Sequence, residues 1–127
     1  MSLLWVRVAS SPLEGFQGET KDYEGRVGNR SHLTRVQHGT LPIEAVRDMP
    51  GVRGEVPGEH RNRLGDRWDA FKDDIAANGI TNPIFITHDY GEEPKISEGN
   101  HRRDAAVELG HGRVPVEIRH FGHAEQD

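Results

Sequence analysis

The residues best suited to chemistry lie together in one short run of the chain, Glu98-Gly99-Asn100-His101-Arg102-Arg103. A short expected strand, Lys95-Ile96-Ser97, precedes this run, and a helix-like stretch follows it. A glycine between a strand and a helix lets the backbone turn sharply, and the first N–H groups of the helix then point unsatisfied at whatever lies there. Such a turn is a ready-made site for an anion.

The same run places three basic side chains, His101, Arg102 and Arg103, in the first turn of the expected helix. Cations are unfavourable there, because the N-terminal end of a helix already carries partial positive charge. Something negative must compensate them. A bound phosphate would do so, and so would Glu98 or Asp104 in a local ion pair, and both interpretations remain open at this point.

Two helices are expected to position the run. The spacing of Leu64, Trp68, Phe71 and Ile75 predicts a helix over residues 65–78 whose apolar stripe belongs to the core. A second helix is predicted over residues 100–109, with Asn100 as its N-cap and a glycine as its stop.

Three strands are expected around these helices, at residues 84–87, 95–97 and 114–118. The first is continuously apolar, which is typical of a strand covered on both faces. In the third, Pro115 indicates a sheet edge or a position that needs no N–H donor.

The sequence as a whole predicts a protein of three parts. Residues 1–37 are predicted to form a strand at 3–8 followed by an irregular extension, and residues 38–121 one domain. That domain opens with a short strand at 41–43 and a turn, followed by a Gly/Pro-rich loop. Residues 122–127 are expected to be a flexible tail. The fold class is therefore predicted to be α+β, with a short mixed sheet and flanking helices.

Composition narrows the possible functions. The chain has 127 residues, the usual size of a single domain, and a net charge of −5, which disfavours binding through many phosphates of a duplex. The absence of cysteine excludes thiol chemistry and agrees with a cytoplasmic location. No apolar run approaches the length of a membrane span.

Although the chain has eight histidines, the pairs His120/His123 and Glu98/His101 do not have the pattern of a zinc site, and no metal ligands are predicted.

The run 98–103, with the Asn78-Gly79-Ile80 and Pro83-Ile84 segments upstream and Val114-Pro115-Val116 downstream, resembles the ParB/sulfiredoxin superfamily. The resemblance covers residues 38–121. Asn100 stands where sulfiredoxins carry their nucleophilic cysteine, so sulfiredoxin chemistry is excluded. The partitioning ParB proteins also carry a helix-turn-helix domain, which is not expected in a chain of this length.

The resemblance implies a nucleotide-dependent phosphotransferase or nucleoside triphosphatase. Residues Glu98, Gly99, Asn100, His101, Arg102 and Arg103 would then bind a nucleoside di- or triphosphate with Mg²⁺. It further implies a loop carboxylate as the general base, for which we choose Glu59 over Glu55, and His101 as a second catalytic residue.

The alternative is a ParB-like DNA-binding or nuclease module of phage or plasmid type. In that case DNA would contact the basic cluster Arg61, Arg63, Arg102 and Arg103.

Overall fold

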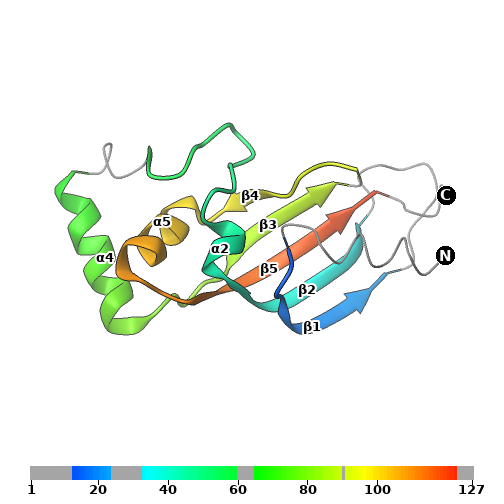
Figure 1. Cartoon of the computed structure of the whole chain (residues 1–127), viewed down its shortest axis with the longest axis horizontal. Coiled ribbons are helices and arrows are strands. Elements are labelled where there is room, and N and C mark those ends of the chain that lie inside the picture. The colour runs from blue at the N-terminus through cyan, green and yellow to red at the C-terminus, as the bar shows by residue number, and fades with distance from the viewer. Residues whose placement is uncertain (1–12, 24–32, 60–64, 90, 123–127) are drawn as a thin grey trace.

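The computed structural model of the chain describes residues 13–23, 33–59, 65–89 and 91–122. It contains one five-stranded sheet, with helices gathered at one end of it (Figure 1). None of the helices in these ranges is long and apolar enough to cross a membrane.

The sheet has the strand order β1-β2-β5-β3-β4. Its strands are β1 (Gln17–Asp22), β2 (Leu33–Pro42), β3 (Ile84–Asp89), β4 (Lys95–Glu98) and β5 (Arg113–Phe121). Three neighbouring pairs are antiparallel, and β3 with β5 is the parallel pair. The predicted α+β class with a mixed sheet is confirmed.

The first two strands correct the expectation of an irregular extension up to residue 37. Strand β1 lies at the edge of the sheet, and β2 runs across residue 37 without a break and pairs with β5. All six residues of β1 are exposed, so the strand has no apolar alternation by which the sequence could reveal it. The strand expected at residues 3–8, and most of the tail expected at 122–127, lie outside the described residues.

The two predicted helices are confirmed as α4 (Asp66–Asn78) and α5 (Asn100–Leu109), whereas a single helical turn, α2 (Ile43–Val46), begins where a strand was expected to end. Helix α4 ends at Gly79 and α5 at Gly110. The N-cap of α5 is Gly99 rather than Asn100, whose side chain is buried.

Strand β3 corrects the expectation of a strand covered on both faces. Ile84 and Ile86 are buried on one face, whereas Phe85 and Thr87 alternate with them and are only half-buried. The β5 strand is central, so Pro115 is not at a sheet edge. It lies one residue before the ladder between β3 and β5 begins, where its missing N–H costs that ladder nothing.

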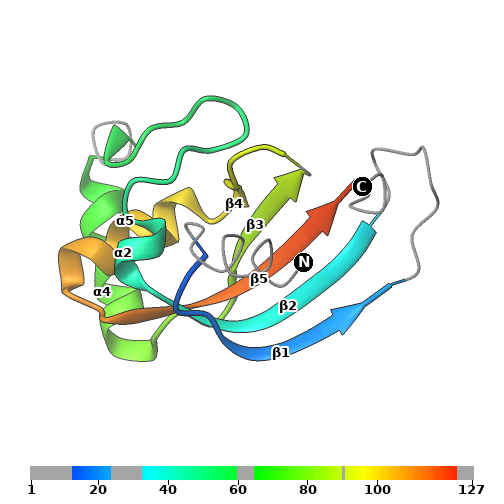
Figure 2. The same ribbon diagram turned by 45° about the vertical axis from the view of Figure 1, so that its right-hand side comes forward.

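The core has two parts that meet at α5. One lies between the sheet, α2 and α5, and includes the buried Leu41, Val46, Ile84, Ile86, Ile96, Ala106, Val116 and Ile118. The other packs Trp68 and Ile75 of α4 against Ala105 of α5. The chain passes from β4 through Gly99 directly into α5. The packing of α5 holds its first turn beside the loop that follows α2 (Figure 2).

Candidate functional site

The turn between β4 and α5 is built on Gly99, whose φ of +107° lies in the left-handed region that favours glycine. A Cβ at this position would come 2.9 Å from Nη1 of Arg102 and 3.2 Å from Cα of Ile84. The backbone of β3 therefore approaches the turn closely. Because Gly99 has no side chain, it cannot cap the first N–H groups of α5, which agrees with the anion site expected from the sequence.

Arg103 does not belong to that site. Its side chain is fully buried, and its guanidinium donates to Oδ1 of Asp104 at 2.6 Å and to the backbone oxygens of Val46 and Met49 at 2.8 and 2.7 Å. The local ion pair that the sequence left open is thus formed, between Arg103 and Asp104. Arg103 fixes α5 to α2 and to the start of the following loop, so the expectation that it grips phosphate is wrong.

Arg102 is placed differently. Its Nη1 donates to the carbonyl oxygen of Pro83 at 2.7 Å, and the side chain is half-buried. No carboxylate of the described residues pairs with it, and its remaining N–H groups have no hydrogen-bond acceptor among those residues. The guanidinium is therefore held in place by one bond while its charge stays uncompensated by the described part of the chain.

The two residues between Gly99 and Arg102 differ in role. The ring of His101 is half-buried and stands edge-on to Phe71 of α4, with ring centroids 6.1 Å apart. The Asn100 side chain is buried, and its Oδ1 accepts a long hydrogen bond of 3.4 Å from Arg103. His101 thus lies in the first turn beside Arg102, whereas Asn100 supports the packing beneath it.

The loop after α2 runs along the outer edge of β4. Ile96 donates to the carbonyl of Pro50 at 2.9 Å, and its own carbonyl accepts from the N–H of Val52 at 3.0 Å. A Cβ on Gly51 would clash with Oε1 of Glu55 and come 3.0 Å from Nδ2 of Asn100. The carboxylate of Glu55 and the first residue of α5 therefore border the same glycine.

Glu59, the base chosen from the sequence, lies in a turn further along this loop. Its Oε1 accepts a hydrogen bond of 3.2 Å from the N–H of Val56, and its own N–H donates to the Val56 carbonyl. The described contacts thus place Glu55 beside the β4–α5 turn, and those of Glu59 lie within its own turn of the loop.

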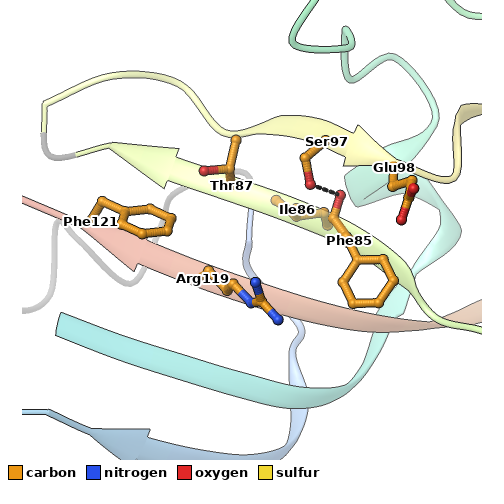
Figure 3. A pocket seen from close by; sticks show the side chains of 7 residues that line it. All are labelled: Phe85, Ile86, Thr87, Ser97, Glu98, Arg119 and Phe121. Carbon is orange, nitrogen blue, oxygen red and sulfur yellow. Dashed lines mark hydrogen bonds between the residues drawn. The ribbon is translucent and has the colours of Figure 1, made fainter. Parts of the chain in front are cut away.

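Glu98 faces the open side of the sheet, where an open pocket of about 520 Å³ begins. Figure 3 shows its side chain close to the ring of Phe85, with Arg119 and Phe121 further along the same surface. The Arg119 guanidinium lies 5.9 Å from the centre of the Phe85 ring and is paired with Glu117. The signal for this pocket in the sequence is the alternation of apolar and polar residues along β3 and β5. No site was predicted on this face of the sheet.

Two further sequence expectations can be compared with the structure. Within residues 13–23, 33–59, 65–89 and 91–122, no group of three or more acidic, histidine or cysteine side chains could hold a metal ion. Of the basic cluster suggested for DNA, Arg103 is buried, and Arg61 and Arg63 lie outside the described residues.

Comparison of the chain with models of known protein families finds no match, and comparison with curated proteins finds none either.

Proposed function

We propose that the chain binds the phosphates of a nucleoside di- or triphosphate, accompanied by Mg²⁺, at the β4–α5 turn, in a fold of the ParB/sulfiredoxin type. The observation that carries the proposal is the uncompensated guanidinium of Arg102, half-buried at the start of a helix that Gly99 leaves uncapped. A buried or half-buried charge is costly without a partner, and phosphate oxygens satisfy both the guanidinium and the helix N–H groups.

Turnover would be phosphoryl transfer or nucleotide hydrolysis. Arg102 and His101 would stabilise charge on the transferred phosphate, and a loop carboxylate would accept the proton of the attacking hydroxyl or water. The position of Glu55 beside Asn100 favours it for this role over Glu59, which was the choice from the sequence.

Thermal unfolding of the full chain with ATP, ADP, CTP and GTP, each with Mg²⁺, tests the proposal. At least one nucleotide should raise Tm, since a ligand at about 100 times its Kd stabilises the folded state by about 2.7 kcal/mol. Arg102→Ala should abolish that shift, and Arg53→Ala, which removes an exposed arginine of the neighbouring loop, should preserve it. The absence of a shift with every nucleotide would refute the proposal.

A further inference from the structure

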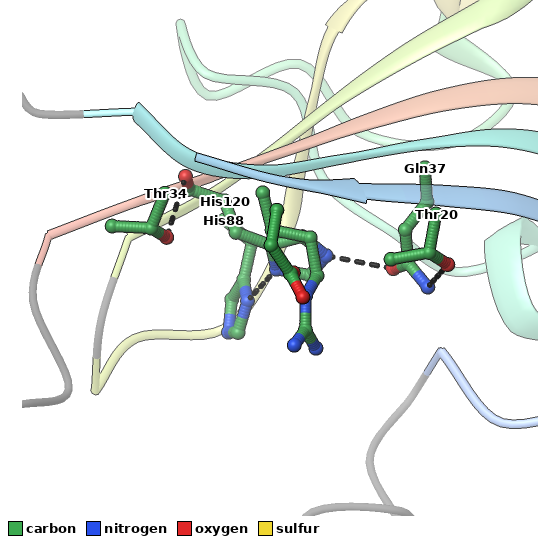
Figure 4. A network of polar contacts seen from close by, with 7 residues as sticks. Thr20, Thr34, Gln37, His88 and His120 are labelled. Atoms are coloured by element: carbon green, nitrogen blue, oxygen red, sulfur yellow. Dashed lines mark hydrogen bonds and ion pairs between the residues drawn. The ribbon is translucent and has the colours of Figure 1, made fainter. Parts of the chain in front are cut away.

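Two histidines on neighbouring strands meet on one face of the sheet, away from the β4–α5 turn. In the parallel pairing of β3 with β5, His88 lies opposite His120, so both side chains project to the same side. Their Nδ1 atoms are 2.9 Å apart, and the two rings are nearly perpendicular, at 83° (Figure 4).

The hydrogen bonds around this pair fix where the protons are. Nε2 of His120 lies 2.8 Å from Oε1 of Gln37, whose Nε2 in turn donates to Oγ1 of Thr20 at 3.2 Å. An amide oxygen can only accept, so His120 carries its proton on Nε2 and presents a lone pair at Nδ1. His88 must then donate from its own Nδ1 to that lone pair.

This arrangement has the features of a metal-binding imidazole. A histidine that ligates a metal usually donates its other N–H to an oxygen acceptor, which fixes its tautomer and orientation, and Gln37 provides this for His120. Metal–nitrogen bonds are about 2.0–2.1 Å long, so two of them at a right angle place their nitrogens about 2.9 Å apart. The hydrogen bond between the two rings already sets this separation, at 2.9 Å, and right angles are typical of Cu²⁺ and Ni²⁺.

We propose that His88 and His120 bind one divalent transition-metal ion, of the Cu²⁺ or Ni²⁺ type, through their two Nδ1 atoms. Binding requires that His88 move its proton from Nδ1 to Nε2 and that the two rings turn, because in the hydrogen-bonded pair the Nδ1–H of His88 points at Nδ1 of His120. No net proton is released. No third acidic, histidine or cysteine group of the described residues completes a larger cluster, so the two imidazoles are the ligands that this part of the chain supplies. The ion would link β3 to β5.

The residues around the histidine pair determine the form in which His120 binds a metal ion and the strength of that binding. Gln37 holds His120 in the tautomer that presents a lone pair at Nδ1, and Arg35 lies opposite His120 in the pairing of β2 with β5. Arg35 is itself paired with Asp22, with Nε and Oδ1 2.6 Å apart. Because the Arg35 charge also repels a metal cation, Arg35→Gln should tighten binding and Asp22→Asn should weaken it.

Titration of the full chain with CuCl₂ or NiCl₂, followed by calorimetry and, for Cu²⁺, by electron paramagnetic resonance, tests the site. The wild type should bind one ion with nitrogen couplings from two imidazoles, and His88→Ala and His120→Ala should each weaken binding by at least about tenfold. His38→Ala, which removes an exposed histidine of β2, is the matched control and should bind as the wild type does.

If His120→Ala fails to fold, His88→Ala decides the outcome, because His88 lies at the end of the hydrogen-bonded chain. Equal affinity of the wild type and His88→Ala, or a loss of affinity in His38→Ala alone, would overturn the proposal.

Discussion

The guanidinium Nε of Arg103 lies 2.6 Å from Oδ1 of Asp104, and both side chains are buried. Removing one partner of a buried ion pair leaves the other charge uncompensated, which costs about 3–5 kcal/mol. Arg103→Lys keeps the positive charge, but a lysine cannot reach Asp104, Val46 and Met49 together, and each buried acceptor left without a donor costs about 1–3 kcal/mol. The free energy of unfolding should therefore fall by about 3 kcal/mol. Urea unfolding measures this loss.

Arg53→Lys is the control for this substitution. Arg53 is exposed, with its Nη1 3.8 Å from Glu55, and its replacement should change stability by no more than about 0.5 kcal/mol. A similar effect of both substitutions would contradict the structural role assigned to Arg103.

Gly99 and Gly110 flank helix α5 at its two ends, and both have positive φ, but their surroundings differ. At Gly110 there is nothing within 4 Å of an added Cβ, so Gly110→Ala should cost only the backbone strain, about 1–2 kcal/mol. Gly99→Ala adds a close approach to Ile84 and Arg102, and the loss should be on the order of 3 kcal/mol. Equal losses in denaturant unfolding would mean that the turn is less tightly packed than described.

His120 makes the stability of the protein sensitive to acid. Burial lowers its pKa from 6.5 in the unfolded chain to about 4 in the folded protein, so the unfolded state binds the proton more readily. The stabilisation is complete above pH 6.5 and is lost as the pH falls from 6.5 towards 4. His120→Gln should flatten the urea midpoint over this range, whereas His38→Gln should leave the wild-type slope. An unchanged slope in His120→Gln would contradict this explanation.

The elements around the candidate site differ in how far sequence could predict them. Helices α4 and α5 follow from apolar spacing and from their terminal glycines, because those signals are local. Which of Arg102 and Arg103 can bind a phosphate could not be predicted in this way. Arg103 is held by the carbonyls of Val46 and Met49, more than fifty residues earlier, and no local pattern reveals this contact. The meeting of His88 and His120 likewise depends on the register of two strands that are distant in sequence.

The choice between the two loop carboxylates can be tested once a nucleotide that turns over is known. Glu55→Gln keeps the oxygen that accepts from the N–H of Arg53 but removes the base, so nucleotide affinity should be retained while turnover falls by about 10² or more. Glu59→Gln should retain most turnover. Release of phosphate, measured for both variants, distinguishes them, and the reverse result would restore Glu59 as the base.

The most direct test of phosphate binding at the β4–α5 turn is to record ¹⁵N–¹H correlation spectra of the full chain during titration with the nucleotide that gives the largest thermal shift, with Mg²⁺ present. The backbone amides of Gly99 to Arg102, and the side-chain Nε–H of Arg102, should show the largest changes, because these groups would donate to the phosphate oxygens. Changes confined to Phe85, Thr87 and Arg119, on the open face of the sheet, or no changes at all, would contradict the assignment of the site.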